Sequence, residues 1–250
     1  MITYLRTRAD KLIKKSKPSI SDDFYAEHYI EVLNTGIIGR VSGITHKLLE
    51  RGIRISDYFG KVLELGAGHG QHLQYVKHDY EVYYESDFRL ENIPHRSDQD
   101  WNRVILRIQA DAQELSGFED SSIDRVIATC LIVHLEKPEK ALEEWRRIAS
   151  PGAVISVYVA CEPGIVLRSI RYMTTVQKSK KRGVKHLSVH YREHINFFPR
   201  LNLLINEVFA HDEVKRHFWP FYIPSWNSNL GVVYTIRINK DENLTAEEEV

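Results

Sequence analysis

Three glycines that directly follow an apolar run are the residues in this sequence with the clearest chemical use. The run Lys61–Leu65 leads into Gly66, Gly68 and Gly70. Glycine tolerates positive φ angles and lets a ligand approach the backbone closely. In an open parallel sheet, a turn from a strand into a helix lies at the carboxyl edge, where such sheets bind ligands. We therefore expect a ligand-binding turn here, followed by a helix.

The spacing and charge of this turn indicate which kind of ligand it suits. The dinucleotide fingerprint spaces its glycines as G-x-G-x-x-G, whereas the third glycine here comes one position early. Glu64 stands two residues before Gly66, where its carboxylate would repel a pyrophosphate. The pattern thus disfavours a dehydrogenase and favours a ligand with a positive charge.

The motifs around this turn resemble, in order and spacing, those of the class I S-adenosylmethionine-dependent methyltransferases of the small-molecule, type 11-like kind. The resemblance covers about residues 61–159, and the flanks 1–60 and 160–250 carry no signature of a subfamily. The segments that carry it are Glu64-x-Gly66-x-Gly68-x-Gly70, Asp87 after the second expected strand, Asp111-Ala112-Gln113-Glu114-Leu115, Ser121–Ile127, Leu131–Leu135 and Ala149–Ala153.

The resemblance implies S-adenosyl-L-methionine as the cofactor and a methyltransferase activity. It matches Asp87 to the acidic residue that holds the ribose hydroxyls, and Asp111 to the residue that accepts a hydrogen bond from the adenine amino group. Glu85 competes for the ribose role, but Asp87 better suits the start of a following helix. The expected cofactor-binding residues are Glu64, Gly66, Ala67, Gly68, Gly70, Asp87, Phe88, Asp111, Ala112 and Thr129.

His134 is the candidate catalytic residue. It follows the expected fourth strand and so lies at the same sheet edge as the glycine turn. A hydroxyl acceptor gains from a general base with a pKa near neutrality, and histidine meets that need. A carboxylate acceptor would need no base, which would leave His134 a binding role. A structural role in packing the loop is the alternative.

A segment rich in histidine and aromatic residues is the candidate acceptor site. His190, Tyr191 and His194 are the expected substrate-binding residues. His186, His190 and His194 are spaced to share one helical face. No cysteine or nearby carboxylate completes a metal site, so we predict no metal.

The acceptor is expected to be a small molecule methylated on oxygen, through a hydroxyl or a carboxylate, with a sugar or another anionic metabolite as candidates. A nucleic-acid methyltransferase could use the basic loop Lys178–Lys185. Against it, base-amino methyltransferases carry Asn/Asp-Pro-Pro-aromatic where this chain has Thr129–Ile132, and the chain has 34 basic and 34 acidic residues. Methylation of a small amine and a non-catalytic cofactor-binding scaffold are further alternatives.

Short β-rich runs that alternate with helical or loop stretches predict an α/β, doubly wound, mostly parallel sheet. The family resemblance implies a Rossmann-like sheet of seven strands with an antiparallel last strand. The clearest helix is Pro138–Ala149, and another is expected around Ser42–Arg51. The expected strands are Lys61–Leu65, Glu81–Glu85, Val104–Gln109, Asp124–Thr129, Ala153–Val159, Asp212–Phe218 and Gly231–Ile238.

The chain of 250 residues is expected to hold an N-terminal helical cap over 1–60 and a methyltransferase domain over 61–250, with an insertion or lid over 163–200. The basic start has helical spacing, and we favour packing on the domain over contact of residues 2–17 with a membrane surface. Two cysteines, an apolar run of at most nine residues and no signal peptide predict a cytoplasmic protein with no transmembrane segment.

Overall fold

A computed structural model describes residues 36–89, 104–181 and 186–239. The expected basic N-terminal helix, for which we favour packing on the domain over membrane contact of residues 2–17, lies outside the described residues. Within the described residues, no helix combines the length and the hydropathy needed to cross a bilayer.

A seven-stranded sheet in the order β3-β2-β1-β4-β5-β7-β6 forms the centre of the molecule. Strands β3, β2, β1, β4 and β5 pair in parallel, and β7 is antiparallel to both β5 and β6. This confirms the predicted doubly wound sheet with an antiparallel last strand. The strands are β1 (Tyr58–Leu65), β2 (Asp79–Asp87), β3 (Val104–Gln109), β4 (Ile123–Thr129), β5 (Ala149–Ala160), β6 (Glu213–Trp219) and β7 (Gly231–Arg237).

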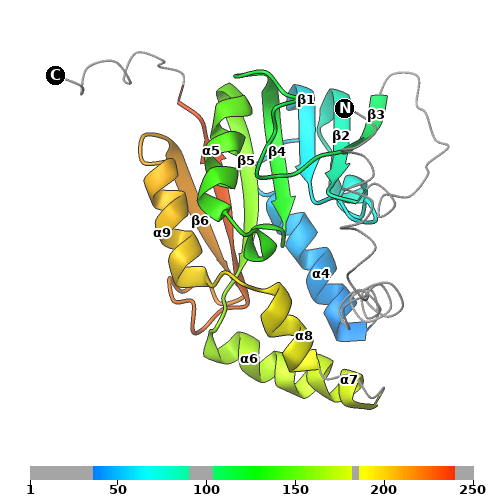
Figure 1. Ribbon diagram of the computed structural model, residues 1–250, viewed down its shortest axis with the longest axis vertical. Coiled ribbons are helices and arrows are strands. Elements are labelled where there is room, and N and C mark those ends of the chain that lie inside the picture. The colour runs from blue at the N-terminus through cyan, green and yellow to red at the C-terminus, as the bar shows by residue number, and fades with distance from the viewer. Residues whose placement is uncertain (1–35, 90–103, 182–185, 240–250) are drawn as a thin grey trace, which may run out of the picture.

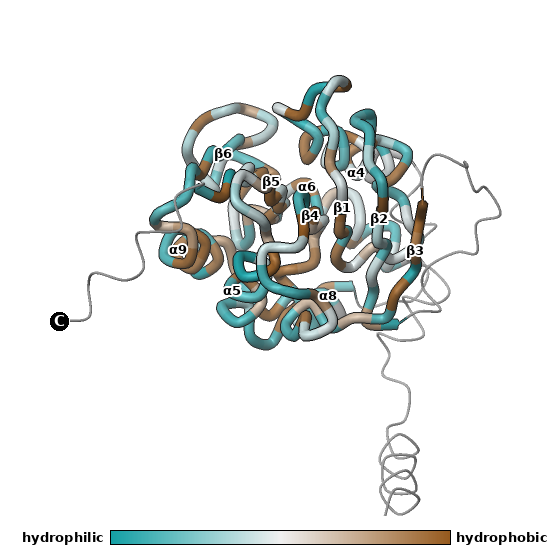
Figure 2. The backbone as a smooth tube through the Cα atoms, turned by 90° about the horizontal axis from the view of Figure 1, so that it is seen from above, coloured by the Kyte–Doolittle hydropathy of each residue, from teal (hydrophilic) through white to brown (hydrophobic). Residues whose placement is uncertain are grey.

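Helices cover both faces of the sheet (Figures 1 and 2). On one face α5 (Pro138–Ile148) and α9 (Phe198–Val208) pack together over the larger apolar core, which includes Trp145, Leu201 and Ile155. On the other face α4 (Gly36–Leu49) contacts β4, β5 and β7 and contributes Leu49 to a second core. The burial of apolar side chains between layers is the main stabilising contribution.

A buried ionic network joins α4 to the sheet. Arg125 on β4 is fully buried, and its Nη2 donates to the Glu50 carboxylate at 2.6 Å. His72 lies 2.8 Å from the same carboxylate, and His46 lies 3.1 Å from His72. Burial lowers the pKa of His46 to about 3, so it remains neutral inside the protein. Glu50 therefore compensates the Arg125 charge that the fold removes from water.

Two local expectations were wrong. The predicted helix after the glycine turn is only a 3₁₀ turn, η2 (Leu73–Tyr75), because β2 begins at Asp79 and the linking segment is short. The predicted basic loop Lys178–Lys185 begins as a helix, α7 (Gln177–Lys181), while residues 182–185 lie outside the described part.

Short helices gather beyond the carboxyl ends of the central strands (Figure 1). They are α6 (Ile165–Arg171), the π-helix η5 (Tyr172–Val176), α7 and α8 (His186–Glu193), and η5 contacts the other three. They occupy the segment predicted as an insertion, and α9, which packs on α5, begins at Phe198 inside that predicted range.

Candidate active site

The glycine turn adopts the backbone conformation that its sequence predicts. Gly66, Gly68 and Gly70 have φ angles of +65°, +52° and +63°. A Cβ at Gly66 would lie 2.9 Å from a methyl group of Leu131, so Gly66 is required for packing against the loop after β4. A Cβ at Gly68 would meet no atom within 4 Å, so this glycine borders open space. The second glycine is therefore the one that leaves room for a ligand.

Glu64 lies beneath the turn rather than at the surface. Its side chain is 2% exposed, and Tyr83 on β2 donates its hydroxyl to the Glu64 carboxylate at 2.8 Å. Burial and the neighbouring carboxylate both raise the pKa of Tyr83, which keeps its hydroxyl protonated as a donor. Glu64 thus brings negative charge close to the turn, as the motif predicts.

Asp87 lies against the glycine turn. Its Oδ2 accepts a hydrogen bond from the backbone N–H of Gly68 at 3.0 Å, and its Oδ1 accepts one from Arg89 N–H at 3.0 Å. Glu85, its competitor for the ribose role, is fully buried two residues earlier on β2. The geometry supports Asp87, because it stands at the end of the strand beside the open turn.

The remaining predicted cofactor residues lie at the ends of neighbouring strands. Asp111 follows β3, and its Oδ1 accepts the backbone N–H of Gln113 at 2.9 Å. Ala112 is 7% exposed and its carbonyl accepts the Trp145 indole N–H, which places it in the wall of the core. Phe88 is 66% exposed. Thr129, the last residue of β4, has a buried hydroxyl with no hydrogen-bond partner.

These features fit a bound S-adenosylmethionine. The space over Gly68 admits a ligand close to the backbone, Asp87 offers carboxylate oxygens beside it, and the Thr129 hydroxyl lacks a partner. The carboxylates of Glu64 and Asp87 suit a ligand that carries a sulfonium charge. Gly68, Asp87, Asp111 and Thr129 follow or end parallel strands, so they share one edge of the sheet.

His134 lies in η4 (Ile132–His134), directly after β4. Its Nδ1 lies 3.0 Å from the backbone carbonyl of Glu193, which can only accept, so Nδ1 carries the proton and Nε2 holds the lone pair. Burial and the nearby His194 lower the pKa of His134 to about 4. His134 is thus neutral at pH 7 and is a weaker base than the near-neutral one that the sequence predicts.

The structure brings two of the three predicted acceptor residues together and leaves the third exposed. His190 is 7% exposed and turns inward, where its Nε2 lies 3.0 Å from Glu162 Oε1. The Nδ1 of His194 lies 3.1 Å from the same oxygen. Tyr191 is 47% exposed, and its hydroxyl makes no hydrogen bond with Glu162. The structure therefore brings His190 and His194 together with Glu162 and leaves Tyr191 to another surface.

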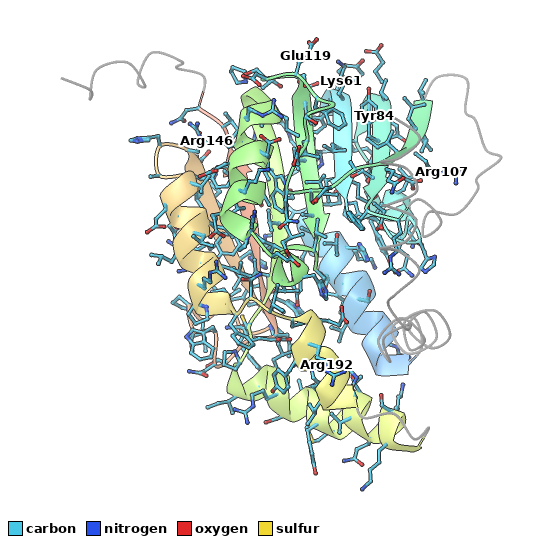
Figure 3. All side chains as sticks on the ribbon, in the orientation of Figure 1. Lys61, Tyr84, Arg107, Glu119, Arg146 and Arg192 are labelled. Carbon is cyan, nitrogen blue, oxygen red and sulfur yellow. The ribbon has the colours of Figure 1, made fainter. Side chains whose placement is uncertain are left out.

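Tyr191 lines a groove of about 580 Å³ between α6, η5 and α8. Arg171 also lines the groove and pairs with Glu162, so the groove adjoins the histidine cluster. Its other apolar and cationic lining residues include Tyr172, Met173, Leu187 and Arg168. A second cavity, of about 610 Å³, is lined by Lys61, Tyr84 and Glu119, which lie at the other end of the molecule from Arg192 of α8 (Figure 3).

Sequence reasoning missed Glu162 and Arg171. Glu162 is a carboxylate just beyond the end of β5, and the rule that selected Asp87 after β2 would have found it. Burial by itself raises the pKa of Glu162, but the two imidazoles and Arg171 outweigh it and hold the pKa below its usual range. Glu162 is therefore ionised although it is only 1% exposed.

The fold and the glycine turn together define a class of protein, the Rossmann-like methyltransferases with their cofactor site at the carboxyl edge of the sheet. Residues 63–157 match the sequence model of a family described as "Methyltransferase domain". This part of the chain is a methyltransferase domain of the S-adenosylmethionine-dependent class. No curated protein sequence matches the chain.

Solved structures with the same fold include several methyltransferases. A protein from Haloferax volcanii, in complex with the Trm112 methyltransferase activator, superposes with a TM-score of 0.60 and 15% identity, covering 90% of this chain and all of its own. A methyltransferase from Thermotoga maritima superposes with a TM-score of 0.54 and 18% identity, covering 87% of this chain and 98% of its own. A methyltransferase from Archaeoglobus fulgidus superposes with a TM-score of 0.54 and 13% identity, covering 84% of this chain and 100% of its own. At these identities the likeness concerns the fold.

Proposed function

We propose that the protein transfers the methyl group of S-adenosylmethionine to an oxygen atom of a small-molecule acceptor, either a hydroxyl or a carboxylate. The observation that carries this proposal is the fixed tautomer of His134. The Glu193 carbonyl holds the Nδ1 proton, which leaves the Nε2 lone pair available to an acceptor hydroxyl at the end of β4. The cofactor supplies an electrophilic methyl group on its sulfonium.

His134 accepts the hydroxyl hydrogen and orients the oxygen in this proposal. The proton of a hydroxyl becomes strongly acidic only as the new carbon–oxygen bond forms, so a weak base suffices if it receives the proton late. Correct positioning of the oxygen in line with the methyl group contributes most of the catalysis. A carboxylate acceptor has no proton to lose, and His134 then serves only to bind it.

The groove beside the cluster supports an acceptor with an apolar part and a negative charge. Tyr172, Met173 and Leu187 provide apolar contact, while Arg168 and Arg171 provide positive charge. This lining favours a hydrophobic acid or a phenolic acid over an unmodified sugar. Tyr191 also lines this groove, which supports its proposed role in binding the acceptor.

The test is formation of S-adenosylhomocysteine with a panel of phenols, hydroxy acids, carboxylic acids, sugars, amines and RNA, with methyl-labelled cofactor to locate the product. We expect oxygen-methylated acids or phenols. With a hydroxyl acceptor, His134→Ala should lower kcat by roughly 10²–10⁴-fold and leave S-adenosylhomocysteine affinity unchanged, whereas the exposed His211→Ala should change neither. Label found only in amines or RNA would contradict the proposal.

A further inference from the structure

One side-chain cluster brings together a buried carboxylate and two imidazoles whose facing polar atoms make no hydrogen bond of good geometry. The cluster consists of Glu162, His190 and His194, and one ligand atom of each lies within 4.8 Å of the other two. The two histidine nitrogens are 3.0 and 3.1 Å from Glu162 Oε1. Neither imidazole makes a hydrogen bond of good geometry through that nitrogen, and Glu162 Oε2, also buried, has no partner.

These distances are those of ligands around a shared ion. With metal–ligand bonds of about 2.0–2.2 Å, neighbouring ligand atoms are separated by roughly 3.0–3.5 Å. A shared ion also accounts for the poor hydrogen-bond geometry between these groups. Each histidine nitrogen would point its lone pair at the ion, so it would not point directly at the carboxylate oxygen.

The fold holds the three ligands in place from separate elements. Glu162 follows β5, while His190 and His194 are one helical turn apart, with His194 N–H donating to His190 carbonyl at 2.8 Å. The end of α8 is fastened to the loop after β4, since Ile195 and Asn196 both donate to the Val133 carbonyl. The cluster is therefore held by long-range contacts and does not depend on α8 alone.

We propose that Glu162, His190 and His194 bind one divalent transition-metal ion. Two imidazoles and one carboxylate are a ligand set used by zinc and by non-haem iron, and three protein ligands leave coordination positions for a small molecule. Arg171 contacts Glu162 Oε1 and is the competing cation at this carboxylate. The nearby rings of His134 and His186 approach His194 and His190, respectively, to centroid distances of 4.6 and 5.7 Å and complete the surroundings.

The site lies at the edge of the sheet where the acceptor is proposed to bind, and its use there rests on the proposed function. A metal ion lowers the pKa of a bound hydroxyl. The acceptor oxygen, once its proton has passed to a base, would attack the methyl carbon. The carbon–oxygen bond then forms as the carbon–sulfur bond breaks, and the sulfur leaves as a neutral thioether.

The experiment titrates the full chain, purified without a histidine tag and stripped with a chelator, with Co²⁺ and with Zn²⁺. We expect one equivalent of Co²⁺ to produce visible d–d absorption bands and one equivalent of Zn²⁺ to remove them. His190→Ala and His194→Ala should each weaken binding by at least about tenfold, because even outer-shell substitutions typically cost 10–100-fold. The exposed His211→Ala is the matched control and should bind the metal as the wild type does.

Arg171→Gln provides a second, independent test. Removing the competing cation should tighten metal binding if the ion uses the Glu162 carboxylate. Circular dichroism and S-adenosylhomocysteine binding show that each variant is folded. Absence of a stoichiometric Co²⁺ spectrum in wild type, or unchanged affinity in both histidine variants, would overturn the metal site. If the wild type fails to bind the metal but still binds S-adenosylhomocysteine, only the metal site is refuted and the proposed function stands. If the wild type does not bind S-adenosylhomocysteine, the proposed function is refuted.

Discussion

Substitution of Gly68 separates the two roles that a glycine can have in this turn. Gly68 has a φ of +52°, and a Cβ there would meet no protein atom within 4 Å. In Gly68→Ala the only cost to the folded protein is therefore that alanine must adopt a left-handed backbone conformation. This lowers the free energy of unfolding by about 1–2 kcal/mol. For a chain of this length that lowers the melting temperature by roughly 2–8 °C.

The same substitution should have a disproportionate effect on the cofactor. If the open space over Gly68 holds S-adenosylmethionine, a methyl group there overlaps the ligand, and we expect affinity to fall by at least about tenfold, or ~1.4 kcal/mol. The branched side chain of Gly68→Val should abolish binding. Calorimetric titration with S-adenosylhomocysteine measures the affinity, and thermal unfolding of the unliganded protein measures the stability.

Gly52 offers a matched control. It has a φ of +81° and likewise borders open space, but it lies in the turn after α4, away from the cofactor edge. Gly52→Ala should lose a similar amount of stability and bind S-adenosylhomocysteine normally. Wild-type affinity in both Gly68 variants would refute the placement of the cofactor. An equal loss of affinity in Gly52→Ala would show that backbone strain, not overlap, is the cause.

Three further predictions follow from buried charge and hydrogen bonding. Asp87→Ala should weaken S-adenosylhomocysteine binding by about 1–3 kcal/mol, in calorimetry, because it removes a proposed ribose ligand that also holds Gly68 N–H. Glu50→Gln should lower the free energy of unfolding in urea by about 3–5 kcal/mol, because it leaves the Arg125 charge buried without a counter-charge. Stability should also fall as the pH drops from about 6.5 toward 3, since unfolded His46 binds a proton that the folded, buried side chain excludes.

Each of these predictions has a control. If Glu85→Ala weakens cofactor binding and Asp87→Ala does not, the assignment of the ribose ligand is wrong. Exchange of an exposed carboxylate, Glu143→Gln, should leave the urea midpoint unchanged, in contrast to Glu50→Gln. His46→Gln should reduce the acid sensitivity by up to about 1.4 kcal/mol per pH unit, and an unchanged slope would show that other groups dominate.

The sequence by itself determined the sheet and the cofactor turn. Apolar periodicity and glycine positions are local properties, so the β-rich runs at Lys61–Leu65 and Val104–Gln109 and the left-handed glycines could be read from neighbouring residues. The seven strands and the antiparallel β7 came from the resemblance of the motifs, and the strand pairings confirm them. The order of the strands across the sheet came from the tertiary structure. The helix expected after Gly70 did not form. The segment between the end of β1 and the start of β2 is too short for it and holds only the 3₁₀ turn η2.

Tertiary structure decided which polar residues meet. Nothing in the local sequence joins Glu162 to His190 and His194, and they meet only because the end of α8 is anchored to the loop after β4. The same anchoring fixes the tautomer of His134 and partly shields its ring from water. This shielding, with the nearby His194, lowers its pKa to about 4, where the sequence alone predicts a value near neutrality. Burial and long-range contacts set the charge state of a side chain, and both depend on how the whole chain folds.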